Sequence, residues 1–118
     1  MIALFAMVLA TQAVAVPKSD RDAFETYRQC VLGEARKAPL SESADDVWAH
    51  ATKACELDLA AARLTMAADE TATSAEAIAD GKPDPAAAPN ATTATQRADA
   101  MQKELAAEVA ALRTNATK

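Results

Sequence analysis

Apolar residues recur at helical intervals near the start of the chain, over residues 20–37. Four of them fall on one face of a helix: Phe24, Tyr27, Val31 and Ala35. Residues 19–22 have the spacing of a capping box, which marks a helix N-terminus. Pro39 disfavours further helix, because the residue before a proline avoids helical backbone angles. The pattern therefore predicts a first helix from about Asp20 to Lys37.

A longer apolar pattern begins at Ser43, whose hydroxyl suits a helix N-cap. The predicted stripe of this second helix consists of Val47, Trp48, Ala51, Cys55, Leu59, Ala62 and Met66. A second face carries Ala54, Leu57, Ala61 and Leu64, which predicts contact with more than one neighbour. Thr71 and Thr73 weaken the helix before a restart that reaches Asp80, and Gly81 then ends it.

Three prolines interrupt residues 81–92, where no apolar periodicity is present, so this stretch is predicted to be a linker. Capping-box spacing at residues 93–96 starts a last amphipathic helix over residues 93–118. Its apolar face consists of Met101, Leu105, Val109 and Leu112. Because this segment has few large side chains, we expect a loosely attached helix that binds a partner through these residues.

The first fifteen residues form an uncharged, apolar segment that is too short to span a bilayer as a helix. Small residues at positions 13–15 suit cleavage by signal peptidase, and Lys18 follows soon after. Residues 1–15 are therefore predicted to be a signal peptide, and the mature chain to begin at Val16. We expect a periplasmic or secreted protein without stable membrane insertion after cleavage. The predicted division is a signal peptide (1–15), a helical hairpin (16–80), a linker (81–92) and a C-terminal helix (93–118).

Composition adds to this picture and excludes some classes of partner. Alanine makes up about a quarter of the 118 residues, and only two glycines are present, so helix is favoured throughout. The net charge is -5, with no basic patch and no interleaved aromatic residues. This balance argues against nucleic-acid binding and against adsorption to an anionic membrane surface.

Two cysteines, Cys30 and Cys55, lie on facing stripes if the first two helices form an antiparallel hairpin. A disulfide between them closes a loop of about 26 residues, for which chain entropy gives ~3.5 kcal/mol. An oxidising export compartment permits such a bond. The prediction is thus an all-α fold: a disulfide-stapled antiparallel hairpin plus a C-terminal helix.

His50 raises two alternatives to this structural role. With a cysteine and Asp46 it assembles a thiol, an imidazole and a carboxylate, but His50 lies off the face of Cys55 and no oxyanion site is evident. Asp46 and His50, spaced i,i+4, are weak candidate metal ligands, although a structural zinc site takes four ligands. Trp48 either fills the loop end of a thin core or anchors a partner.

The pattern Tyr27-x-x-Cys30-Val31, Ser43-x-Asp45-Asp46, Ala54-Cys55 and Ala60-Ala61-Ala62-Arg63 resembles small exported two-cysteine helical proteins of Gram-negative bacteria with no assigned function. The resemblance covers about residues 24–63, implies a periplasmic setting and brings no active site. We expect a non-enzymatic protein without a cofactor. Its role is interaction or structure in the cell envelope, through a protein partner or coiled-coil self-association. The alternative is a small-ligand or metal-binding periplasmic protein using His50 and nearby carboxylates.

Overall fold

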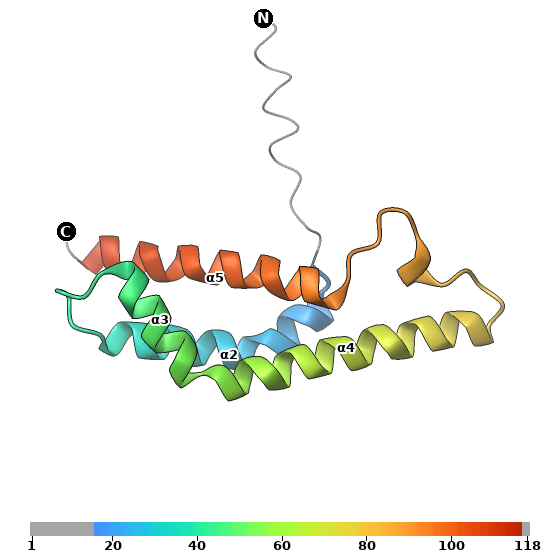
Figure 1. Ribbon diagram of the computed structural model, residues 1–118, viewed down its shortest axis with the longest axis horizontal. Helices are drawn as coiled ribbons and strands as arrows, with labels where there is room; N and C mark the ends of the chain where they lie inside the picture. The colour runs from blue at the N-terminus through green and yellow to red at the C-terminus, as the bar shows by residue number, and fades with distance from the viewer. Residues whose placement is uncertain (1–15, 117–118) are drawn as a thin grey trace, which may run out of the picture.

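The computed structural model describes residues 16–116, and within this range every regular element is a helix. The elements are α2 (Lys18–Lys37), α3 (Ala44–Ala54), α4 (Glu56–Ala79), the short 3-10 helix η1 (Pro85–Ala87) and α5 (Ala94–Ala116) (Figure 1). The predicted all-α class is confirmed. The predicted signal peptide lies outside the described residues.

Helix α2 packs against α3 and α4, which return along it in the opposite direction and complete the predicted hairpin (Figure 1). A disulfide joins Cys30 of α2 to Cys55, with 6.0 Å between the two Cα atoms. Buried residues of α2 and of the returning helices share one core: Phe24, Tyr27, Val31, Leu32, Ala35, Val47, Ala51, Cys55, Ala62 and Met66. The predicted staple and most of the predicted apolar stripes are therefore confirmed.

The returning arm of the hairpin is two helices rather than one, and the interruption lies at Cys55. Ser43 caps α3 as predicted, since its hydroxyl accepts a hydrogen bond from the Asp46 amide at 3.2 Å. The backbone then leaves helical geometry at Cys55, where ψ is 16°. No proline or glycine lies between Ser43 and Ala79. The break thus coincides with the disulfide-bonded residue, and the expected weakening at residues 71–73 does not occur.

Helix α4 ends at Ala79, and Gly81 terminates it as the sequence predicts. This glycine has a φ of 71°, which is the left-handed conformation that glycine adopts without a Cβ penalty. The Lys82 amide donates to the Ala77 carbonyl at 2.8 Å and the Gly81 amide to the Ile78 carbonyl at 3.1 Å, which together form a Schellman motif. The chain then returns through η1, which packs against α4.

Helix α5 begins with the predicted capping box. The Thr93 hydroxyl accepts from the Gln96 amide at 3.1 Å, and the Gln96 side chain accepts from the Thr93 amide at 2.8 Å. The helix then runs in the same direction as α2, and it packs against α2, α3 and α4 (Figure 1). The hairpin and its C-terminal helix therefore form one bundle.

The expectation of a loosely attached α5 differs from the structure. Met101, Leu105 and Val109 are buried in the common core, and Leu112 packs against it. Polar contacts add to this attachment: Arg28 pairs with Glu108 at 2.8 Å, and Arg113 donates to the carbonyls of Ala38, Pro39 and Glu42 at the far end of α2. The apolar stripe of α5 is short of large side chains, but it faces three helices at once.

Candidate functional site

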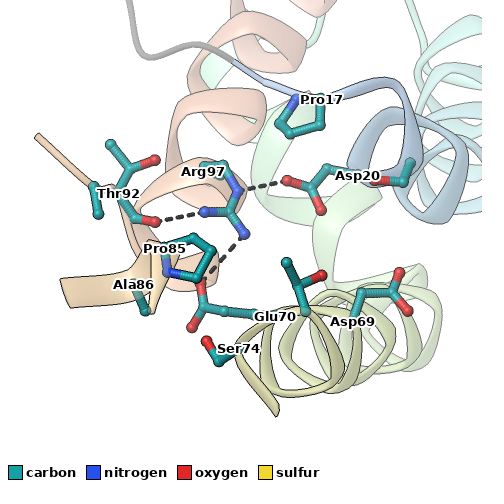
Figure 2. A pocket seen from close by; sticks show the side chains of 12 residues that line it. Pro17, Asp20, Asp69, Glu70, Ser74, Pro85, Ala86, Thr92 and Arg97 are labelled. Carbon is teal, nitrogen blue, oxygen red and sulfur yellow. Dashed lines mark hydrogen bonds and ion pairs between the residues drawn. The ribbon is translucent and has the colours of Figure 1, made fainter. Parts of the chain in front are cut away.

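A pocket of about 280 Å³ lies where the beginnings of α2 and α5 meet the middle of α4 and the return loop (Figure 2). Its lining is polar at the centre and includes Asp20, Asp69, Glu70 and Arg97. Pro17, at the start of α2, and Pro85 and Ala86, in η1, form parts of the wall. The pocket is therefore built from four segments that are distant in sequence.

Arg97 is the central polar group of this pocket, and each of its nitrogens donates to an acceptor of the protein (Figure 2). Nε donates to Asp20 Oδ2 at 2.5 Å, one terminal nitrogen donates to the Thr92 carbonyl, and the other to Glu70 Oε2 at 3.3 Å. The Arg97 side chain is 14% exposed and that of Asp20 is 4% exposed. These groups are thus removed from water and depend on one another.

Glu70 has a second role in the same cluster. Its Oε2 atom accepts a hydrogen bond from the Ala94 amide at 2.6 Å, so a side chain of α4 caps the first turn of α5. A carboxylate at this position also complements the positive end of the helix dipole. Asp20, Glu70 and Arg97 consequently tie three helices together at one end of the bundle.

This cluster was not predicted from the sequence, although the chain carries a signal for it. Asp20 lies four residues before Phe24, and Arg97 lies four residues before Met101. Each charged residue therefore extends an apolar stripe by one helical turn, onto the face that is buried. An acidic and a basic residue on buried faces are expected to form an ion pair, because burying an unpaired charge costs free energy.

The charged groups at the centre of the pocket contact one another. Its arginine and two of its carboxylates are engaged with one another, and the rest of the polar lining consists of Asp69 and the hydroxyl residues Ser19, Thr73, Ser74 and Thr92. Both cysteines are engaged in the disulfide, so the chain offers no free thiol. The acid-base and thiol chemistry considered from the sequence does not come together here.

His50 lies far from this pocket in the sequence, on α3, and its side chain is 75% exposed. Its Nδ1 atom pairs with the carboxylate of Glu42 in the turn before α3. Asp46 contributes its amide to the Ser43 cap. Within residues 16–116, no three histidine, cysteine, aspartate or glutamate side chains are grouped so that they could hold a metal ion.

The partner-binding candidates from the sequence occupy inward positions. Met101, Leu105 and Val109 are buried, while Leu112 and Trp48 are half-buried and pack against the core. These side chains hold the bundle together and do not form an open surface. The candidate surface lies instead on the second apolar face predicted from the sequence, which belongs to α4.

That surface, the outer face of α4, consists of Leu57, Ala61, Leu64, Ala68, Thr71, Ala75 and Ile78, all of which are exposed. Leu57 is 82% exposed, Leu64 73% and Ile78 62%. Across residues 16–114, four large apolar side chains are exposed, and three of them lie on this one face. In the view of Figure 1, α4 forms the lower edge of the molecule and the other helices lie above it.

Comparisons with models of protein families, with curated proteins and with solved structures find no match to this chain. None of the helices in the described part of the chain combines the length and the apolar character needed to cross a lipid bilayer.

Proposed function

We propose that this chain is an exported, non-enzymatic interaction protein of the cell envelope, and that the outer face of α4 binds an α-helix of another chain. The observation that carries the proposal is the alignment of Leu57, Leu64 and Ile78 on one exposed helix face. Single exposed apolar residues are ordinary on protein surfaces, but a contiguous stripe of them is typical of an interaction site.

The architecture supports this role because it holds the binding helix without covering it. Packing against α2 and α5 covers the opposite side of α4, where Ala62 and Met66 are buried. The disulfide at Cys55 anchors the beginning of α4, and the Schellman motif defines its end. A helix that is already ordered loses less conformational entropy on binding than one that folds on its partner.

The energetics favour a partner that contributes apolar residues of its own. Burying a leucine or isoleucine side chain stabilises by about 1.5–3 kcal/mol, so the three large residues of this face supply roughly 4–9 kcal/mol. Association costs an estimated 4–15 kcal/mol in lost translational and rotational freedom. A second apolar helix, laid along the face, supplies the missing part of the binding free energy.

Export is supported by the apolar segment of residues 1–15 and by the small residues at 13–15. The disulfide agrees with it, because such bonds persist mainly in oxidising compartments outside the cytosol. The alternative, a metal-binding role for His50, draws less support from an imidazole that is 75% exposed and paired with one carboxylate.

Site-specific photo-crosslinking in the cells that export the protein tests this function. A photoreactive residue replaces Ala61 on the outer face of α4 or, as a matched control, the exposed Ala49 of α3. We expect covalent adducts from position 61 that disappear when Leu64→Glu is added, and none from position 49. Equal adducts from both positions, or adducts that persist with Leu64→Glu, would show that this face is not the binding surface.

A further inference from the structure

The spacing along the outer face of α4 allows the partner to be named. The seven residues of this face, all exposed, follow one another at intervals of four and three: Leu57, Ala61, Leu64, Ala68, Thr71, Ala75 and Ile78. The average interval is 3.5 residues, which is the repeat of the apolar positions in a coiled coil. A stripe with this repeat stays in contact with a partner helix along its whole length. Building on the proposed function, we propose that the partner is the same face of a second copy, bound in antiparallel orientation.

The alternation of small and large residues supports the antiparallel orientation. Alanine occupies every second position of the stripe, and a larger residue occupies each position between. In an antiparallel pair whose twofold axis passes at the level of Met66, Leu64 lies opposite Ala68 of the second copy. Leu57 then lies opposite Ala75, and Thr71 opposite Ala61. Each layer then combines one small and one larger side chain, which gives an even packing density. A parallel copy instead stacks alanine on alanine and leucine on leucine, which leaves voids between bulky layers.

Charge also favours a second copy on this face. The chain carries a net charge of -5, so two copies repel each other over most approaches. The positions that flank the stripe between residues 60 and 74 are uncharged: Ala60, Thr65, Ala67, Ala72 and Ser74. Two acidic copies can therefore meet along this strip without bringing like charges together. The uncharged positions on this strip offer no ion pairs to a basic partner.

The size of the face determines how tight the pairing is. Residues 57–78 span about 33 Å of helix, and with a width of roughly 10 Å each copy contributes a strip of about 330 Å². Two such strips amount to about 660 Å², below the roughly 1,200–2,000 Å² of stable complexes. The dimer is consequently weak and depends on concentration, and the monomer remains folded because its core lies on the other side of α4.

Analytical ultracentrifugation of the mature, oxidised protein over a wide range of concentration tests self-association. We expect a monomer–dimer equilibrium whose Kd rises roughly tenfold or more in Leu64→Glu, since one substitution places two charges in the seam of the dimer. The matched control is Leu40→Glu, because Leu40 is 62% exposed and lies outside α4. This control should leave the Kd unchanged. Both variants should melt at nearly the wild-type temperature, because both side chains are exposed.

Spin labels test the orientation. A single label at the exposed residue 79 of α4 lies 13 residues from the centre of the antiparallel pair, so two labels are separated by about 39 Å along the helix axis. In a parallel pair they lie side by side, about 10 Å apart. A short distance at concentrations where the dimer is populated would overturn the antiparallel arrangement.

The outcomes separate this inference from the proposed function. If the protein stays monomeric, or if its dimer is equally stable with Leu64→Glu, the second copy is not the partner. Adducts from position 61 that depend on Leu64 and contain a different chain would then support the proposed function and overturn this inference. A monomer that also gives no such adducts would contradict both.

Discussion

The buried ion cluster at the start of the bundle leads to the sharpest prediction about stability. Replacing Arg97 with methionine keeps a long, unbranched side chain but removes the guanidinium donors to Asp20 and Glu70. Asp20 is then left 4% exposed beside an apolar neighbour. Removing one partner from a buried ion pair costs about 3–5 kcal/mol, because the remaining charge loses its compensation.

This magnitude is large for a chain of this size. Domains of about 100 residues are stabilised by roughly 5–15 kcal/mol in total, and each kcal/mol shifts the melting temperature by about 4–8 °C. We therefore expect Arg97→Met to lower the melting temperature by at least ~12 °C. Urea denaturation followed by circular dichroism measures the free energy of unfolding for the same variants.

A double-mutant cycle separates the cost of an unpaired charge from the net value of the pair. Asp20→Leu with Arg97→Met removes both charges and keeps the apolar volume, so most of the lost stability should return. The reasoning is refuted if Arg97→Met costs less than about 1 kcal/mol, the upper range for an exposed pair. It is also refuted if the effects of the two substitutions simply add.

Two further predictions concern the hairpin. Thiol labelling of the unreduced protein should find no free cysteine, and reactive thiols would contradict the disulfide. Replacing Cys30 and Cys55 with alanine should lower the free energy of unfolding by ~3.5 kcal/mol. Burial raises the pKa of the Tyr27 hydroxyl, against the lowering effects of its hydrogen bond to Gln102 and of Arg63. Because the unfolded chain releases this proton first, stability should fall as the pH rises above about 10, and less steeply in Tyr27→Phe; identical pH profiles would disprove the assignment.

The sequence was sufficient for those parts of the fold whose causes are local. Ser43, the capping box at residues 93–96 and Gly81 act on backbone groups within a few residues of themselves, and all three were predicted correctly. The capping box expected at residues 19–22 does not form, and α2 begins at Lys18 after Pro17. The disulfide was also predicted, because an antiparallel hairpin places its two cysteines on facing apolar stripes.

The position of α5 in the bundle could not be predicted from local sequence patterns. Apolar periodicity shows that a face is buried but does not show which neighbour covers it. Leu57 and Leu64 lie on a face that was predicted to contact a further neighbour, yet they are exposed. Met101 and Leu105 were predicted to bind a partner, yet they lie in the core of the bundle. The ion pairs that attach α5 to α2 join residues about eighty positions apart, such as Arg28 and Glu108. No local pattern reports a contact of that range.

The parallel course of α2 and α5 has a consequence for the order in which the molecule folds. The polar contacts between these helices join residues 75 to 83 positions apart, whereas the two cysteines are separated by 25. Closing the larger loop requires the whole of α4 and the return loop to be in place, and contacts of long sequence separation form more slowly. The hairpin and its disulfide can therefore form before the last helix docks. We therefore expect the docking of α5, with closure of the Asp20–Arg97 pair, to be the last step of folding.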